Sequence, residues 1–159
     1  MLIVTQLQNK KLSIKADYFY RHRIKNIPNE YEKENLKFLI ENLLDPVREY
    51  LKKPVYINSG FRSKKLNEKV GGSETSNHNF GYAADCEVKG NNIEIARAVL
   101  LLGLDFDELI VEKGSVSNPN WIHLALRRDK PNRKKLLFYN GKNYLKLDRN
   151  SILNSKTKL

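Results

Sequence analysis

Apolar residues recur at helical spacing early in the chain and at alternate positions later. Between Glu30 and Lys52 the apolar side chains fall three or four residues apart, which predicts a helix. They are Leu36, Leu39, Ile40, Leu43, Leu44, Val47 and Leu51. Pro46 interrupts this pattern. The helix therefore either kinks there, or a second helix starts with Asp45 as its cap and Pro46 in its first turn.

Shorter patterns predict the other elements. Strands are expected at Pro54–Ile57, Tyr82–Val88, Glu108–Glu112 and Trp121–Leu126, and helices at Ser63–Val70 and Asn92–Gly103. The polar stretch Ser73–Gly81 is expected to be a loop. Asn140-Gly141 joins Leu136–Tyr139 to Tyr144–Leu147 and is a strong hairpin signal. The fold class is α+β, an antiparallel sheet with helices packed on one face. Residues 1–148 form a single predicted domain, followed by a frayed polar tail at 149–159.

Alternation along three strands indicates which side chains leave the core. In Trp121–Leu126 the apolar residues share one face, so His123 points to the other. The same argument turns Asp85 and Glu112 away from the core. These side chains are therefore expected to converge on one sheet face, with His78 arriving from the preceding loop.

Two histidines and a carboxylate are suitable ligands for a catalytic zinc ion. Three N/O ligands leave a fourth position for water, and a nearby carboxylate can take its proton. Cys86 is the only cysteine, which excludes a cysteine-based zinc cluster and an internal disulfide. The only other histidine besides His78 and His123 is His22, in a basic stretch typical of a solvated surface. On spacing alone, however, a histidine on a strand is more often an ordinary surface or core residue.

Several ordered motifs add a family resemblance. They are Ser-Gly-Phe-Arg-Ser at 59–63, Leu-Asn at 66–67, Val-Gly-Gly-Ser at 70–73, Ser-Asn-His-Asn-Phe-Gly-Tyr-Ala-Ala-Asp at 76–85 and Trp-Ile-His at 121–123. In this order and spacing they closely resemble the zinc D-Ala-D-Ala peptidases, a family that also includes D-alanyl-D-alanine dipeptidases, phage endolysins and the hedgehog-like fold. The resemblance covers most of residues 34–126, and the C-terminal hairpin also fits it.

The resemblance implies that His78, Asp85 and His123 hold Zn²⁺. It also implies that Arg62 holds an oxygen of the substrate near the metal, a role that suits a fork of donors that never loses its charge. A structural ion pair is the alternative role for Arg62. Ser76 is expected to brace the ligand loop.

The general base is the least certain assignment, because Asn120 stands where many relatives have an acidic residue and an amide cannot accept a proton. Glu112 matches the glutamate of the similar Asp-[Gln/Glu]-Leu-Ile-x-Glu strand, and we expect it to be the base, ahead of Glu87 and Glu108. Orienting a histidine ligand is the alternative role for Glu112.

Charge and composition then limit the partners. The net charge of +11 favours anionic partners such as a cell wall or nucleic acid, but the lysines are spread along the chain rather than gathered into a reading surface. No apolar run is long enough to span a membrane, and the N-terminus lacks a secretory pattern. We therefore expect a monomeric peptidase, made in the cytoplasm without a signal peptide, that cuts peptidoglycan peptides at the bacterial wall, as a phage lysin or virion protein would. The alternatives are an inactive zinc-containing wall-binding protein and a nucleic-acid-binding protein.

Overall fold

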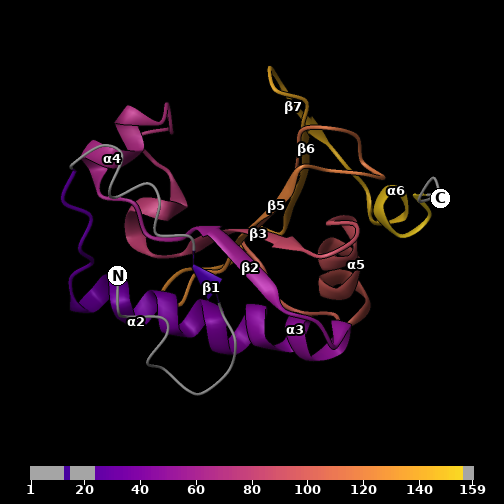
Figure 1. Cartoon of the computed structure of the whole chain (residues 1–159), viewed down its shortest axis with the longest axis horizontal. Helices are drawn as coiled ribbons and strands as arrows, with labels where there is room; N and C mark the ends of the chain where they lie inside the picture. Colours follow the sequence, from indigo (N-terminus) through magenta and orange to yellow (C-terminus); the bar gives the residue numbers. More distant parts are fainter. Residues whose placement is uncertain (1–12, 15–23, 156–159) are drawn as a thin grey trace.

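A seven-stranded sheet runs through the part of the chain that the structure describes, residues 13–14 and 24–155 of a computed structural model (Figure 1). Its strands are β1 Ser13–Ile14, β2 Val55–Ser59, β3 Ala83–Val88, β4 Glu108–Glu112, β5 Trp121–Ala125, β6 Lys135–Tyr139 and β7 Tyr144–Lys146. They lie in the order β1-β2-β3-β5-β4-β6-β7. Neighbours are antiparallel except in two pairs, β1 with β2 and β4 with β6, which are parallel. The predicted α+β class with a mainly antiparallel sheet is confirmed.

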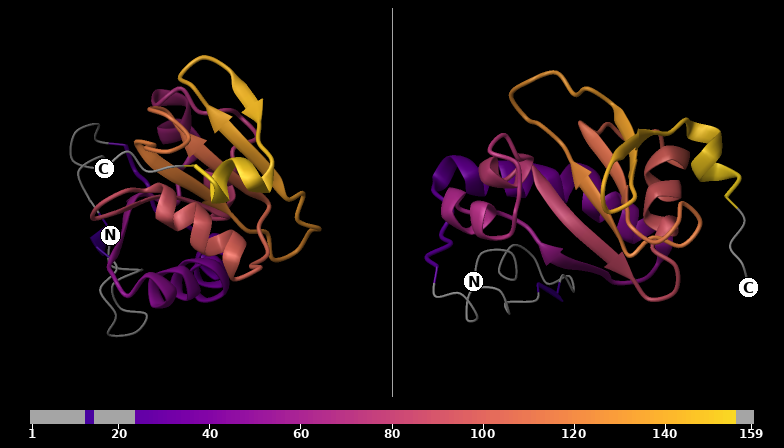
Figure 2. Two further views of the ribbon diagram at one scale, coloured as in Figure 1. Left: turned by 90° about the vertical axis from the view of Figure 1, so that its right-hand side faces the viewer. Right: turned by 90° about the horizontal axis from the view of Figure 1, so that it is seen from above.

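Helices cover one face of this sheet (Figures 1 and 2). They are α2 Glu30–Leu39, α3 Asp45–Leu51, α5 Ile93–Leu101 and α6 Arg149–Leu153. A fifth helix, α4 Lys64–Lys69, lies beside the short 3-10 helix η2 Asn77–Phe80, away from α2 and α3. No helix in the described residues has both the length and the apolar composition needed to cross a membrane.

The first long helix continues past Pro46 through a wider turn. Asn29 caps α2 and forms a reciprocal capping box with Glu32. A π-helical turn, η1 Ile40–Leu44, then leads directly into α3, where Pro46 occupies the first turn. Because proline lacks an N–H and crowds the preceding turn, a wider turn before it lets the helix continue. Asp45 begins α3 but accepts no capping hydrogen bond there.

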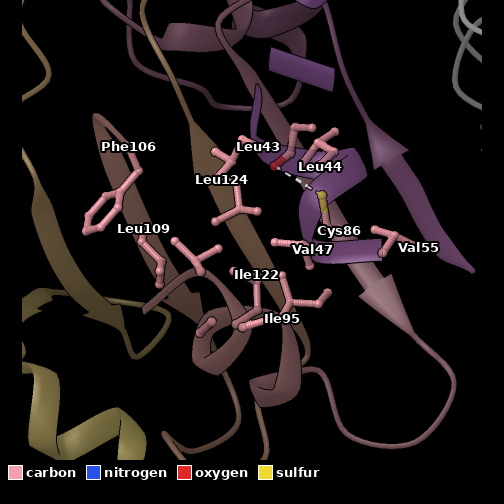
Figure 3. Packing of buried hydrophobic residues seen from close by; sticks show 14 of the residues in the cluster. Leu43, Leu44, Val47, Val55, Cys86, Ile95, Phe106, Leu109, Ile122 and Leu124 are labelled. Atoms are coloured by element: carbon pink, nitrogen blue, oxygen red, sulfur yellow. Dashed lines mark hydrogen bonds between the residues drawn. The ribbon is translucent and has the colours of Figure 1, made fainter. Parts of the chain in front are cut away.

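The core forms where alternate strand residues meet the helices (Figure 3). Cys86 from β3, Ile122 and Leu124 from β5 and Leu109 from β4 are at most 2% exposed and face α2, η1, α3 and α5. The predicted core faces of these three strands are confirmed. Because side chains alternate along a strand, the intervening polar residues must emerge on the opposite face.

The chain after Asp148 differs from its predicted frayed state. Asp148 caps α6 by accepting a hydrogen bond from Ser151 N at 2.8 Å, and Ile152 is fully buried against the core. Arg149 donates to the carbonyl oxygen of Leu100 at 2.6 Å. Residues 149–153 are therefore helical and not frayed, because a cap followed by a buried apolar residue docks one helical turn on α5, while the domain boundary at residue 148 stays a prediction.

Gly81 follows the last residue of η2 and packs against the backbone of α2 at Glu32. Its φ is +73°, and a Cβ at this position would lie 2.4 Å from the carbonyl oxygen of Glu32. Gly103 has a similar φ of +64° but open space around it. Gly81 thus meets two constraints, a left-handed backbone and a close approach, whereas Gly103 meets only the first.

We expect Gly81→Ala to lower the free energy of unfolding by more than about 3 kcal/mol, and Gly103→Ala by about 1 kcal/mol, because only the first adds a backbone clash to the left-handed strain. Urea denaturation of both variants measures the difference. Equal losses would contradict the close packing of Gly81 on α2.

Candidate metal centre

The register of β3 against β5 brings two of the candidate ligands together. Asp85 pairs directly with His123 across these antiparallel strands, so their side chains lie on the same face. His78 reaches them from η2, which Ser76 caps by accepting a hydrogen bond from the His78 N–H at 3.3 Å. Ser76 therefore braces this turn, as the sequence predicted, and the expected loop at Ser73–Gly81 includes one turn of 3-10 helix.

Three donor atoms converge at this point. His78 Nε2 lies 3.2 Å from His123 Nδ1 and 3.2 Å from Asp85 Oδ1, and His123 Nδ1 lies 2.9 Å from the same carboxylate oxygen. All three residues are at most 9% exposed. Two imidazole nitrogens and a carboxylate oxygen in this arrangement could hold a metal ion.

The second polar atom of each of these three side chains points away from the convergence point, toward a different group. His78 Nδ1 lies 2.7 Å from the carbonyl oxygen of Gly60, to which it can donate. Asp85 Oδ2 accepts a hydrogen bond from Arg62 Nη2 at 2.5 Å. His123 Nε2 is buried without a hydrogen bond, and Glu108 Oε2 lies 4.0 Å away. The convergent atoms are thus those left free for a ligand role.

The charges in this group suit a divalent cation. Burial disfavours the ionised form of Asp85, but the two histidines outweigh it and hold its pKa well below the usual range. Burial lowers the pKa of His78, whereas in His123 the hydrogen bond with Asp85 overcomes burial and raises the pKa. The carboxylate is therefore ionised, and the donor set has the N/O chemistry that zinc accepts.

Arg62 lies behind the carboxylate ligand candidate. Besides its bond to Asp85, it donates from Nε to Ser59 Oγ at 2.7 Å, and its backbone N–H bonds the carbonyl oxygen of His78 at 3.0 Å. Arg62 thus links β2 to the ligand turn and to Asp85, which is the ion-pair arrangement. Its third nitrogen, Nη1, makes no hydrogen bond within the described residues.

Glu112 lies on the same face, near His123. It is two residues beyond Ile110, the direct partner of His123 on β4, and its side chain is 9% exposed. Its carboxylate forms no hydrogen bond or ion pair with the described residues. Burial, only partly offset by His123, therefore raises the pKa of Glu112 to about 7.

The other candidate bases occupy different positions. Glu87 accepts a hydrogen bond from Asn58. Asn120 is exposed at the start of β5 and bonds the Glu112 carbonyl through its backbone. Glu108 faces the outer nitrogen of His123 and not the convergent atoms. His22 lies outside the described residues.

A buried ionic network around Asp107 lies beside η2, and the sequence analysis placed Asp107 in a strand motif without assigning it this role. Asp107 is fully buried and accepts hydrogen bonds from Arg133 Nε at 2.9 Å and Asn77 Nδ2 at 3.1 Å, with Arg127 Nε at 3.1 Å. Asn77 also donates to Glu108 at 2.9 Å. The network ties the residue before His78 to β4 and to the segment after β5. The buried aspartate could have been suspected only from its position before a strand.

The raised pKa of Glu112 predicts a pH effect on the metal-free protein. A carboxyl whose pKa rises from 4.5 to about 7 on folding is protonated more readily in the folded state. Its stabilising effect is complete below pH 4.5 and is lost as the pH rises through 7. Between pH 5 and pH 8 the wild type should lose about 1–3 kcal/mol of stability relative to Glu112→Gln.

Urea denaturation of both proteins in the presence of a chelator measures this difference, in which the titration of the shared histidines cancels. A constant difference across this range would contradict the burial of an unpaired carboxyl.

A comparison with known proteins agrees with this geometry. The protein-family model described as Peptidase M15 matches residues 21–125, well over half of the chain. The matched stretch contains His78, Asp85, His123 and Glu112. A search of curated proteins found no match. The resemblance predicted from the ordered motifs is confirmed: the chain belongs to the Peptidase M15 family.

Proposed function

We propose that this chain is a zinc metallopeptidase that hydrolyses peptide bonds of bacterial peptidoglycan, as a D-Ala-D-Ala carboxypeptidase or an endopeptidase. The observation that carries the proposal is the convergence of His78 Nε2, Asp85 Oδ1 and His123 Nδ1 within 3.2 Å of one another, with the partnerless carboxylate of Glu112 on the same face. Membership of the M15 family supports the peptidase chemistry, and the motifs around these residues support a wall peptide as substrate.

The three convergent atoms would hold the zinc ion. When bound by two imidazoles and one carboxylate, zinc supplies a Lewis acid with an open position, which polarises a carbonyl group and acidifies water. The partners behind the ligands keep their donor atoms aimed inward. The Gly60 carbonyl does so for His78, and the Arg62 guanidinium does so for Asp85.

Glu112 would act as the general base. It takes a proton from the attacking water and returns that proton to the leaving nitrogen, which requires a carboxyl whose pKa is near the working pH. A pKa of about 7 meets this requirement, and the absence of a hydrogen-bond partner in the described residues leaves its oxygens available. Asn120, three residues before His123, cannot do this chemistry.

Arg62 would serve two partners. Nη2 is committed to Asp85, and Nη1 is left to donate to a carbonyl or carboxylate oxygen of the substrate. Bonding Asp85 and the substrate at once needs the two terminal nitrogens of the planar guanidinium group, so a lysine at this position would make at most one of the two contacts.

We expect Glu112→Gln to lower kcat at least about 100-fold while zinc affinity stays the same, because the amide keeps the shape but cannot take a proton. Release of amine groups from purified peptidoglycan measures turnover, and elemental analysis measures bound zinc. Glu87→Gln is the matched control. It makes the same change on β3, which β5 separates from β4, at a side chain that bonds Asn58, and should retain activity.

An inactive wall-binding protein is the second candidate, favoured by Asn120 in a position where many relatives carry an acid. A wild type that loads zinc and binds peptidoglycan but releases no amine would replace the peptidase proposal with this one. If Glu112→Gln and Glu87→Gln both lost activity, the assignment of Glu112 as the general base would be refuted, but the peptidase proposal would stand.

Glu108 would orient His123. For Nδ1 to offer its lone pair to the metal, the proton must sit on Nε2, and Glu108 Oε2 lies 4.0 Å from that nitrogen. Asn77 Nδ2 donates to this same oxygen at 2.9 Å, and Arg133 Nη2 lies 2.8 Å from Glu108 Oε1, so the carboxylate is held in place. Glu108 is therefore a positioning residue and not a base.

Glu108→Ala should weaken zinc binding by about 10- to 100-fold, as loss of a group behind a metal ligand typically does. Glu108→Gln keeps an acceptor oxygen and should weaken it less. Competition with a chelating dye gives the affinities, and ¹⁵N NMR of the metal-free protein reports which nitrogen of His123 carries the proton. An unchanged affinity in Glu108→Ala would remove this role.

The proposed site of action is the bacterial wall, reached by a phage-type lysin or a virion protein. The net charge of +11 supports this, since it attracts the protein to an anionic wall.

A further inference from the structure

A row of aromatic side chains extends from Glu112 to the edge of the sheet. Trp121 on β5 pairs with Glu112 on β4, Glu112 pairs with Tyr139 on β6, and Tyr139 pairs with Tyr144 on β7. Directly paired residues point to the same face of a sheet, so all four lie on the face that carries the His–Asp–His group. We call Trp121, Tyr139 and Tyr144 the aromatic shelf.

The shelf is open and held in shape. The rings of Tyr139 and Tyr144 lie 4.6 Å apart at 30°, and the Tyr139 hydroxyl donates to the Gly141 carbonyl in the hairpin turn at 2.9 Å. Tyr144 is 58% exposed, whereas Leu136 and Phe138, on the other face of β6, pack against the core. An exposed ring supported by a second ring offers a flat apolar surface beside the proposed base.

The β6–β7 hairpin carries two of the three shelf rings, Tyr139 and Tyr144. In Figure 1 the β6–β7 hairpin and α4 stand on either side of β3 and β5, away from α2 and α3. The hairpin also lies beyond residues 21–125, the stretch that matches the M15 family. The family match therefore does not imply any role for the hairpin in the site.

Tyr144 keeps its neutral ring at physiological pH. Burial raises the pKa of Tyr144, and the carboxylates of Glu112, Glu108 and Asp85 add to the effect, so its hydroxyl stays protonated. Lys113 Nζ sits 5.2 Å from the centre of the Trp121 ring, where it can make a cation–π contact. The exposed ring of Tyr144 therefore offers an uncharged apolar face to a ligand.

We propose that the aromatic shelf binds a saccharide ring of a wall glycopeptide whose peptide lies across the His–Asp–His group. A pyranose presents C–H groups on one face, which pack on the electron-rich face of an aromatic ring, and keeps its hydroxyls in water. The three rings and Glu112 form one row on the same sheet face, so a ligand bound on the rings would lie next to the proposed base. This inference rests on the proposed function, because it names part of the substrate of the same site.

The test compares a disaccharide-bearing wall peptide with the same peptide lacking the sugar. Tyr144→Ala should raise KM for the glycopeptide about five- to tenfold, with kcat and bound zinc unchanged, and should leave KM for the free peptide as it is. Tyr144→Phe keeps the ring and should behave as the wild type. Tyr50→Ala is the matched control, because Tyr50 is 49% exposed on α3 and lies on the helical side of the molecule.

Equal KM increases for both substrates would show that the shelf holds peptide and would overturn the proposal, as would no increase for either. If the wild type hydrolyses neither substrate, the peptidase proposal fails, and calorimetric titration with the glycopeptide decides the shelf alone. The saccharide-binding role of the shelf would then be supported if the wild type binds the glycopeptide saturably, Tyr144→Ala weakens this binding, and Tyr50→Ala does not. Tighter binding of a single-stranded oligonucleotide through the same tyrosine would replace it with a nucleic-acid surface.

Discussion

The register of β3 against β5 is the constraint on which the rest of the site depends. It sets Asp85 opposite His123 and, one residue further along, Cys86 opposite Ile122. A slip of one residue would turn Asp85 into the core and expose Cys86, so the apolar packing on the helical face holds the register that the polar face needs. The same two strands thus serve as core on one side and as ligand holders on the other.

Asp85 then determines how the ligands are arranged. One carboxylate oxygen lies between the two imidazoles, and the other is held by Arg62. A buried carboxylate with partners on both oxygens stays ionised, which a cation site requires. Glu112, with no partner in the described residues, behaves in the opposite way: its carboxyl is partly protonated near neutral pH. Two carboxylates on one sheet face therefore differ in protonation because of their neighbours, which suits the different roles proposed for them.

The sequence predicted the local elements and the faces of the central strands well, because each depends on short-range alternation. His123, Asp85 and Glu112 were assigned to one face from the apolar residues beside them, and the structure brings them together there. The functional roles of these residues remain proposals. The helix around Pro46 and the last helix were harder to predict. In the first, the periodic pattern predicted a helix but not the π-helical turn that carries it past Pro46, and the second depends on a single buried isoleucine, which shows no period.

Features that depend on long-range pairing could not be predicted from the sequence. A hairpin at residues 136–147 was expected, but its position beside β4 was not, because β6 runs parallel to β4 and nothing local encodes a parallel partner. That pairing places Tyr139 next to Glu112. The position of Glu108 behind His123 likewise follows from the register of β4 against β5 and from Asn77 and Arg133, which approach from distant segments.

The ligands and Glu112 lie on β3, β4, β5 and η2, inside the stretch that matches the M15 family, whereas two of the three shelf aromatics lie on the hairpin that follows it. The hairpin contacts the site through the β4–β6 pairing, while the β3–β5 pairing holds Asp85 and His123 and η2 carries His78. Changes in the hairpin can therefore alter the surface beside Glu112 without moving a ligand. The fold in this way separates the residues proposed for chemistry from those proposed for recognition.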